Sequence, residues 1–466
     1  MNDKPGLRRV MTLWDATLLV MGSVIGSGIF MTTGIIVGFM QAPGPVLLVW
    51  LAGGLVTLFG ALSFGELAGM LPYAGGQFVY LKEAYGRLPA FLFGWAFFWM
   101  IMAGGIAALA VGFSEYLGYF LPGLSNQARI FEFSVAGLPY TLGAGQVLAL
   151  VLIATLSAVN YFGIRGGLLV QNAFTVVRLG SLALFLVAGW LVGKKTGLPH
   201  PGEFLSFEGG LPLRSFGLAL FAALWTYDGW YSVNCAAGEI KKPQITIPLS
   251  LFLGTMGVTV VYVLTNVLYL AAVPIADMSG VVRVGELAAT VMFGSSAASA
   301  ITAAILASIF GCLSATILYG PRVYYAMSEE GLFFRKMNRI HPRYHVPGRA
   351  IVGQAVWSGL LCLTGTYQAL FEYVIFALVL FFAATGAAVI VLRITRSDIA
   401  RPYRAWGYPV VPIIFIGINL AVFVNRLASD PGKSALGLAM ILAGLPAYFF
   451  WTRRARTVKT SEPPPS

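Results

Sequence analysis

Two short segments place glycine and polar residues inside long apolar stretches. The first is VIGSGIF at residues 24–30, and the second is WTYDGW at residues 225–230. Glycine costs about 1 kcal/mol relative to alanine in a helix interior, so each segment favours a break in a membrane helix. For the first segment alone, close packing against a neighbouring helix is an equally good explanation, because small residues are common at membrane helix contacts.

A helix broken inside a membrane exposes backbone groups that need new partners. The N-terminal end of a half-helix presents N–H donors and a partial positive charge, which suits a carboxylate. The C-terminal end presents carbonyl oxygens, which suit an ammonium group or another cation. A free amino acid carries both charges on one carbon, so two crossed broken helices match its zwitterionic head group.

Two ionisable residues lie far from the ends of apolar stretches. Arg178 comes nine positions after the start of the stretch at 169, which is roughly 13 Å into it at the helical rise. An arginine at that depth costs at least ~2.5–3.5 kcal/mol, and a structural ion pair is one explanation for its presence. Asp228 has three explanations: an anchor for a substrate cation, a partner for Arg178, or a hydrogen-bonded support for the break, which we favour.

The elements that must position these residues follow from the composition. The chain has 466 residues, of which 58% are hydrophobic and 10% are charged, against roughly 45–50% and 25% in soluble domains. These proportions exclude a soluble enzyme, a disordered chain and a nucleic-acid-binding protein. The net charge is +12, but the basic residues lie in short gaps between apolar stretches, which is typical of membrane proteins. We therefore expect a lipid bilayer as the surroundings and no nucleic acid partner.

Twelve stretches approach or exceed the ~20 residues that a membrane-spanning helix needs, and the ninth is the shortest. With the N-terminus inside, 22 of the 30 lysines and arginines lie at cytoplasmic gaps or span ends, and 7 lie at outer gaps. This bias predicts a multi-pass protein of the cell membrane with both termini in the cytoplasm. The stretches cover residues 14–40, 45–70, 88–121, 144–162, 169–193, 214–238, 249–273, 297–325, 350–366, 369–392, 410–428 and 434–452.

The two interrupted stretches are the first and the sixth, so spans one to five and six to ten follow one plan. Because five is odd, the second set must be inverted in the membrane. Paired interrupted helices are the best sequence indication of a transporter's binding site near the middle of the bilayer. We predict an all-α integral membrane protein with about 12 transmembrane helices and a five-plus-five inverted-repeat core in which helices 1 and 6 are broken. The predicted segments are a cytoplasmic N-terminus at 1–13, the first repeat at 14–193, the second repeat at 214–392, helices 11 and 12 at 410–452, and a disordered cytoplasmic tail at 453–466.

Residues for catalysis or metal binding are not grouped in this sequence. Cys235, Cys312 and Cys362 lie in apolar stretches without a CxxC spacing, and the three histidines lie in polar gaps. The apolar stretches show no paired carboxylates, and the phosphate-binding motif GxxxxGK[ST] does not occur. We therefore expect neither an enzyme nor an ATP-driven pump, and no catalytic residue, metal or cofactor.

Several segments, in this order, resemble signatures of the amino acid–polyamine–organocation superfamily. Within it, the chain is most similar to the L-type amino acid transporters and the bacterial serine/threonine exchangers. The resemblance implies twelve spans, the inverted-repeat core, and exchange or uptake of amino acids by alternating access. The segments are IGSGIF at 25–30, GELAGMLPYAGGQFVYLKEAYG at 65–86, YDGW at 227–230 with GEIKKPQITIP at 238–248, RVYYAMSEEGLFFRKMNRIHPRYHVPGRAI at 322–351 and RPYRAWGYPVVP at 401–412.

The resemblance also implies roles for single residues. The substrate carboxylate would meet the backbone around Ser27, Gly28 and Ile29, where the second half of span one begins. The substrate ammonium would meet carbonyl oxygens at the two breaks, supplied by Val24, Ile25, Trp225 and Thr226. Trp225 lies where family members carry an aromatic gate over the substrate. The candidate substrate-binding residues are Val24, Ile25, Gly26, Ser27, Gly28, Ile29, Trp225, Thr226, Tyr227 and Asp228.

Arg178 lies where the family often has a lysine, beside the broken first span and where sodium-coupled relatives bind sodium. Arginine effectively never deprotonates, so its side chain is expected to replace sodium as a fixed cation without releasing a proton. Family members that pair with a heavy chain hold a cysteine between spans three and four. Residues 122–143 contain no cysteine, so we expect no disulfide-linked heavy subunit.

The predicted function is secondary active transport of L-amino acids, by exchange or uptake and without sodium. Neutral amino acids are the expected substrates, because Trp225, Tyr227 and Trp230 form an aromatic wall suited to apolar or small polar side chains. The alternative is a polyamine or cationic amino acid carrier of the same superfamily. Asp228 keeps this alternative open, because a carboxylate near the middle of the membrane can anchor a second positive charge.

Overall fold

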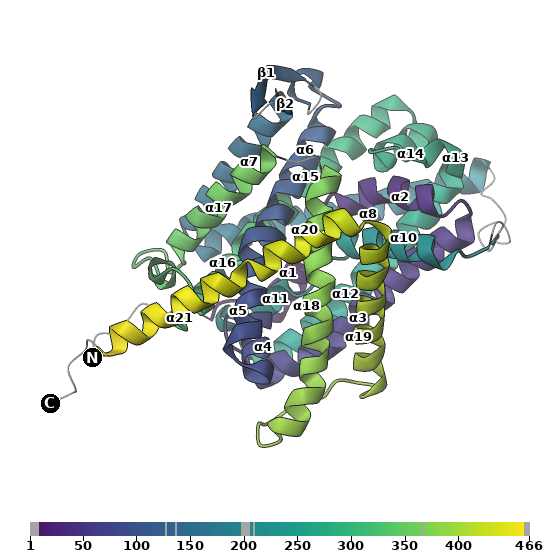
Figure 1. Ribbon diagram of the computed structural model, residues 1–466. Helices are drawn as coiled ribbons and strands as arrows, with labels where there is room; N and C mark the ends of the chain where they lie inside the picture. Colours follow the sequence, from purple (N-terminus) through teal and green to yellow (C-terminus); the bar gives the residue numbers. More distant parts are fainter. Residues whose placement is uncertain are drawn as a thin grey trace.

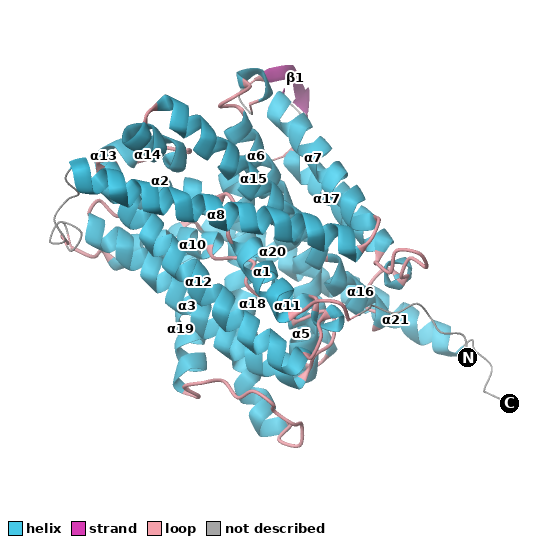
Figure 2. Ribbon diagram, turned by 180° about the vertical axis from the view of Figure 1, so that it is seen from behind, coloured by secondary structure: helices cyan, strands magenta, loops and turns pink. Residues whose placement is uncertain are grey.

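The computed structural model describes residues 9–125, 128–135, 138–196, 206–207, 210–364 and 367–460. Long helices dominate this part of the chain, and they run alongside one another in both views (Figures 1 and 2). Each helix satisfies its own backbone hydrogen bonds, which is why helices suit a chain of this composition in lipid. The first half comprises α1 (Leu13–Val24), α2 (Gly28–Phe39), α3 (Pro43–Met70), α4 (Gln77–Tyr85), α5 (Arg87–Ala96), the π-helix η1 (Phe97–Met102), α6 (Ala103–Leu117), η2 (Pro122–Leu124), α7 (Ala144–Tyr161) and α8 (Ile164–Thr196).

Among the described residues, α8 is the longest helix, with 33 residues, and the next two in length lie in the second half, with 30 and 29 residues. Pro243, Pro321 and Pro431 each begin a helix, at the first turn, where the missing N–H of proline has no helical partner to lose. The elements are α10 (Leu213–Thr226), α11 (Ser232–Cys235), η3 (Ala237–Glu239), α12 (Pro243–Ala272), α13 (Ile275–Met278), α14 (Val284–Phe293), α15 (Ser295–Tyr319), α16 (Pro321–Glu329), η4 (Arg335–Asn338), α17 (Gly348–Cys362), α18 (Tyr367–Thr395), α19 (Val410–Ser429), α20 (Pro431–Leu442) and α21 (Gly444–Thr460).

Nine helices in the described residues are long and apolar enough to cross a membrane, and the bent pair α1–α2 makes ten. Two further predicted spans coincide with helices of 14 and 15 residues, α10 and α17. The predicted class, a helical integral membrane protein, is confirmed. The count of twelve spans remains a prediction.

The all-α expectation needs one correction. Strands β1 (Arg129–Val135) and β2 (Leu138–Gly143) form an antiparallel pair between α6 and α7, with Glu132 opposite Thr141. The segment RIFEFSV is rich in aromatic and β-branched residues, which favour strands. Figure 1 shows the pair at one end of the molecule, beyond the ends of α6 and α7. The hydropathy pattern did not reveal it, because this segment is too polar and too short for a span.

Helices that hold matching positions in the two predicted repeats pack against each other. The pairs are α3 with α12, α6 with α15, and α7 with α17. An arrangement related by a pseudo-two-fold axis brings corresponding helices together in this way. The inverted repeat itself and the predicted segment boundaries remain predictions.

Glu239 ties three distant parts of the chain together. Its carboxylate accepts hydrogen bonds of 3.0 and 2.9 Å from the guanidinium of Arg322, and both side chains are 1% exposed. Its backbone carbonyl accepts from the N–H groups of Val10 and Met11 at 2.9 Å. The segment before α1 is therefore fixed to the chain after α11 and to α16.

Candidate functional site

The predicted break in span one is present. α1 ends at Val24, α2 begins at Gly28, and the two helices meet at an angle of 41°. The glycines allow close contacts that a side chain would block. A Cβ atom at Gly28 would lie 2.7 Å from Oγ1 and 2.9 Å from Cα of Thr226, and one at Gly26 would lie 2.8 Å from Sγ of Cys312.

The predicted break in span six is present too. α10 ends at Thr226, and turns lead to the short helix α11. Gly229 has φ +96°, a value that favours glycine, and a Cβ atom there would lie 2.6 Å from the carbonyl oxygen of Ser23. Gly28 thus lies against Thr226 and Gly229 against Ser23, so the two breaks cross each other.

Tyr262 on α12 joins the two breaks. Its hydroxyl lies 2.9 Å from the carbonyl oxygen of Val24 and 3.1 Å from that of Thr226. These carbonyls belong to the last residues of α1 and α10, where an α-helix leaves its C=O groups without helical partners. One side chain therefore serves the C-terminal ends of both half-helices. Tyr262 carries no distinguishing signal in the sequence, because it is one tyrosine among several in apolar stretches.

Arg178 lies behind the break in span one. Its Nη1 donates to the carbonyl oxygen of Gly22 at 2.7 Å and to that of Ile25. The side chain is fully buried, and Nε and Nη2 have no hydrogen-bond partner among the described residues. Salt bridges within that part of the chain do not involve Arg178 or Asp228. The structural ion pair and the pairing with Asp228 are therefore wrong for the described residues. The guanidinium instead meets the negative end of the α1 dipole.

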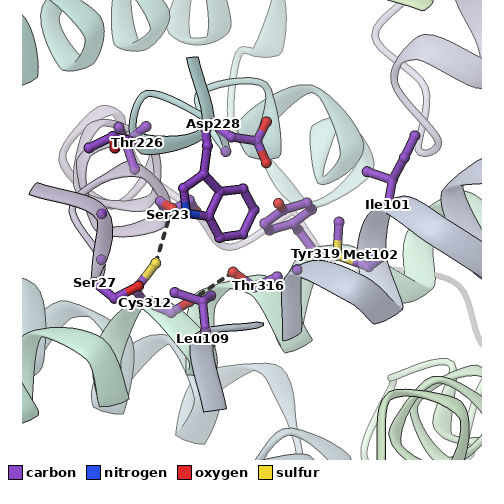
Figure 3. Close-up of a pocket in the computed structure, with 16 residues that line it drawn as sticks. Ser23, Ser27, Ile101, Met102, Leu109, Thr226, Asp228, Cys312, Thr316 and Tyr319 are labelled. Carbon is purple, nitrogen blue, oxygen red and sulfur yellow. Dashed lines mark hydrogen bonds between the residues drawn. The ribbon is translucent and has the colours of Figure 1, made fainter. Parts of the chain in front are cut away.

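A small cavity of about 30 Å³ lies where the breaks cross. That volume holds two or three water molecules, because one water needs roughly 10–15 Å³. Figure 3 shows labelled side chains from both breaks, from the third span and from the eighth around this space. Seven of the predicted binding residues line it: Val24, Gly26, Ser27, Gly28, Trp225, Thr226 and Asp228.

The other predicted residues do not line the cavity. Ile25 directs its carbonyl to Arg178, and Ile29 is fully buried in the core. Tyr227 donates a hydrogen bond of 2.9 Å from its hydroxyl to the carbonyl oxygen of Trp50. Of the predicted aromatic wall of Trp225, Tyr227 and Trp230, Trp225 alone lines the cavity. Its ring stacks on that of Phe371, with ring centres 5.5 Å apart.

A second wall of the cavity was not predicted from the sequence. Ile101 and Met102 come from the π-helix η1, and single π-helical turns occur often at functional sites. The adjacent glycines Gly104 and Gly105 in span three are a sequence feature that could have indicated this region. The residues missed on this wall are Ile101, Met102, Gly105 and Leu109 from η1 and α6, and Cys312, Thr316 and Tyr319 from α15.

The polar atoms of the cavity suit binding rather than catalysis. Oδ1 of Asp228 and Oγ1 of Thr226 are buried without a hydrogen-bond partner among the described residues. Cys312 donates from Sγ to the carbonyl oxygen of Ser23 at 3.1 Å (Figure 3). The described residues contain no group of three or more His, Cys, Asp or Glu side chains that could hold a metal ion. The helix ends at the two breaks offer N–H groups with partial positive charge and carbonyl oxygens with partial negative charge to a small polar molecule.

Two interrupted helices that cross at a cavity within a bundle of membrane spans define the class of secondary transporters. Residues 11–449 match the family model of amino acid permeases. The chain belongs to the amino acid permease family, and the predicted superfamily resemblance is confirmed. It is a membrane transporter and not an enzyme.

Individual relatives resemble this chain over nearly its whole length. The serine/threonine exchanger SteT of Bacillus subtilis (strain 168) is 31% identical over 459 residues, which cover 97% of this chain and 99% of the relative. The b(0,+)-type amino acid transporter 1 of Homo sapiens is 30% identical over 452 residues, with 96% and 88% covered. The cystine/glutamate transporter of Homo sapiens is 26% identical over 466 residues, with 98% and 88% covered.

Proposed function

We propose that this permease exchanges or takes up neutral L-amino acids across the cell membrane by alternating access and without sodium. The crossing of the two helix breaks at one cavity is the observation that carries the proposal. The relatives named as a serine/threonine exchanger and a b(0,+)-type amino acid transporter support it.

The head group of the substrate would bind between the half-helices. Its carboxylate would accept hydrogen bonds from the N–H groups at the start of α2, around Ser27, Gly28 and Ile29, where the helix dipole is positive. Its ammonium would meet the carbonyl oxygens at the ends of α1 and α10. A carbonyl oxygen has two lone pairs, so Val24 and Thr226 can accept from an ammonium as well as from Tyr262. Ile25 would act indirectly, by holding Arg178.

The side chain of the substrate would face the wall formed by η1 and α6. Ile101, Gly105 and Leu109 line the cavity there and carry no charge. Moving a neutral side chain from water to this wall therefore costs little free energy, whereas burying an unpaired charge there costs much more.

Asp228 supports the alternative, a carrier of polyamines or cationic amino acids. Its Oδ1 lies at the cavity without a hydrogen-bond partner among the described residues. A second ammonium group on the substrate would satisfy that oxygen. The carboxylate of Asp228 accepts a hydrogen bond from the backbone N–H of Gly229, the next residue in the break, which supports the favoured role of holding the break.

Transport would require the walls of the cavity to move. A volume of about 30 Å³ is smaller than any amino acid, so the lining elements must separate for the substrate to bind. We propose that the spans at 14–193 and 214–392 form the two inverted repeats that move relative to each other, with 410–452 outside this core. Both termini would face the cytoplasm, according to the bias of basic residues.

Arg178 would take the place of a sodium ion beside the broken first span. It supplies a permanent positive charge to the carbonyl oxygens of Gly22 and Ile25. No disulfide-linked heavy subunit would be needed, because residues 122–143 lack cysteine, and the three cysteines of the chain are buried as free thiols.

Competition for uptake into proteoliposomes tests the proposal. Purified protein would be reconstituted with neutral L-amino acids inside, and labelled serine would be offered outside in choline buffer. Unlabelled neutral amino acids should compete better than lysine or putrescine. If lysine or putrescine competes better than every neutral amino acid, the alternative replaces the proposal. If uptake is absent in choline buffer and returns when sodium is added, the sodium-free mechanism is refuted.

A further inference from the structure

A second, larger cavity lies apart from the candidate site. It is bounded by α8, α12, α14 and α15, reaches α2, and has a volume of about 380 Å³. Ligand-binding cavities commonly measure roughly 300–1,000 Å³ and are mostly apolar. An apolar cavity of roughly 150 Å³ already accommodates benzene. This cavity is therefore large enough for a molecule with a hydrocarbon chain.

The walls of this cavity are apolar except for two hydroxyl groups. Phe185, Phe293 and Ile305 are among the apolar residues, and no described lining residue is charged. The hydroxyl of Ser181 donates to the carbonyl oxygen of Arg178 at 2.9 Å. The hydroxyl of Tyr269 is fully buried and has no hydrogen-bond partner among the described residues. A buried polar group without a partner is unfavourable, so Tyr269 is available to a ligand with one polar group.

The mouth of the cavity lies on a surface suited to lipid. Leu184 on α8 and Ala300 on α15 both line the cavity and are exposed, Leu184 by 69%. Val177 and Leu191 are also exposed, and they lie seven positions before and after Leu184, on the same face of α8. Because this face belongs to an apolar span, molecules reach the mouth from the hydrocarbon of the bilayer.

The cavity is in contact with the half-helix that follows the first break. Phe30 lies two positions after Gly28, and its side chain forms part of the wall. A Cβ atom at Gly285 would lie 3.0 Å from Cδ1 of Phe30 and 3.1 Å from the Tyr269 hydroxyl. An occupant hydrogen-bonded to Tyr269 therefore lies against α2.

We propose that this cavity binds a neutral amphiphile dissolved in the bilayer, with one hydrocarbon chain and one hydroxyl group. The hydroxyl of the ligand pairs with Tyr269, and the chain extends towards Leu184. A charged head group does not fit, because no wall residue would compensate a buried charge. The occupied cavity restricts the movement of α2 and slows transport, a consequence that rests on the proposed function.

Photolabelling tests binding without relying on transport. Purified protein in proteoliposomes would be irradiated with a diazirine-bearing octanol, and the adducts would be located by mass spectrometry with and without 1-decanol. Adducts should appear on the lining residues of α8, α12 or α15 and fall at least fivefold with 1-decanol. Ala188→Phe, which fills the cavity, should reduce labelling at least fivefold, whereas Ala183→Phe, on the exposed surface of the same helix, should leave it unchanged. Tyr269→Phe should raise the 1-decanol concentration needed for competition about tenfold.

Adducts that lie elsewhere, or that persist in Ala188→Phe, would overturn the proposed site. Transport is measured separately, as uptake of labelled serine with 1-decanol or with decane, which lacks the hydroxyl. We expect 1-decanol to slow uptake in the unmutated protein and in Ala183→Phe, and decane to have no effect. If labelling follows the cavity but 1-decanol leaves uptake unchanged, the restriction of α2 is refuted while the binding site stands. If serine is not transported at all, the proposed function fails, and the labelling still decides on binding.

Discussion

Arg178 on α8 donates a hydrogen bond of 2.7 Å to the carbonyl oxygen of Gly22, in the last turn of α1 before the break. Among the described residues, backbone carbonyls and no carboxylate hold this buried guanidinium. Carbonyl oxygens at the end of a half-helix are also the groups that bind cations in interrupted membrane helices. Arg178 therefore makes a permanent cation part of the protein.

Arg178→Ala is predicted to lose transport. The carbonyl oxygens of Gly22 and Ile25 would lose their donor, and each buried group without a partner costs about 1–3 kcal/mol. Arg178→Lys should keep part of the activity, because the charge survives while the planar set of donors does not. Initial uptake rates at equal amounts of folded, reconstituted protein provide the measurement. Full activity of the alanine variant in choline would refute the role of the charge.

Gly28→Val is predicted to abolish transport and to leave the protein in the membrane. The new side chain would meet Thr226 within 2.7–2.9 Å, at the contact between the two breaks. Gly38→Val is the matched control on the same helix, because a Cβ atom there has only Ser279 Oγ nearby, at 3.8 Å. Uptake and detergent-solubilised yield should be measured for both variants. Equal activity of the two would mean that the contact at Gly28 is not needed for transport.

Gly105→Ala is predicted to shift preference towards smaller substrates. Gly105 lines the cavity, and a Cβ atom there would have nothing within 4 Å, so the methyl group enters space without a clash. One methyl group in a pocket changes discrimination by about 1–3 kcal/mol, or tenfold and more. Relative to leucine, alanine should therefore compete for uptake about tenfold better in this variant than in the unmutated protein. Gly180→Ala is the control, because it is equally unobstructed but does not line the cavity.

Asp228→Asn separates the two remaining roles of that carboxylate. If Asp228 supports the break, all substrates should lose uptake together, by about tenfold for a weakened hydrogen-bonded turn. If Asp228 anchors a substrate cation, lysine and putrescine should lose competition while neutral amino acids keep theirs. Competition curves for the three classes of substrate distinguish these outcomes. We expect the common loss.

Arg322→Met is predicted to destabilise the protein by about 3–5 kcal/mol, because it leaves the buried carboxylate of Glu239 without its partner. Adding Glu239→Gln should recover part of the loss, since the remaining group is then neutral. Lys82→Ala breaks a partly exposed pair with Glu330, at 2.8 Å, and should cost at most about 1 kcal/mol. Thermal unfolding in detergent would rank the three variants. If the Arg322→Met variant without the second substitution is as stable as Lys82→Ala, the buried pair of Arg322 and Glu239 does not contribute the predicted stability.

The sequence by itself determined the class of the protein and the position of both helix breaks. Apolar length and glycine placement are local properties, and a membrane leaves a chain of this kind little choice other than helices. The same local properties identified Arg178 as unusual. They could not show its partners, because those are carbonyl oxygens, which every residue carries.

Only the tertiary structure decided which faces of the helices meet at the cavity. Buried membrane helices are apolar on all sides, so hydropathy carries no information about their rotation. Gly105 and Cys312 therefore escaped notice, although they line the cavity, and Tyr227 was assigned to it although its side chain turns towards Trp50. Tyr262 reaches Val24 and Thr226 only because α12 packs beside α1 and ends up close to both breaks. These relationships depend on helix packing across the whole chain, and no local pattern encodes them.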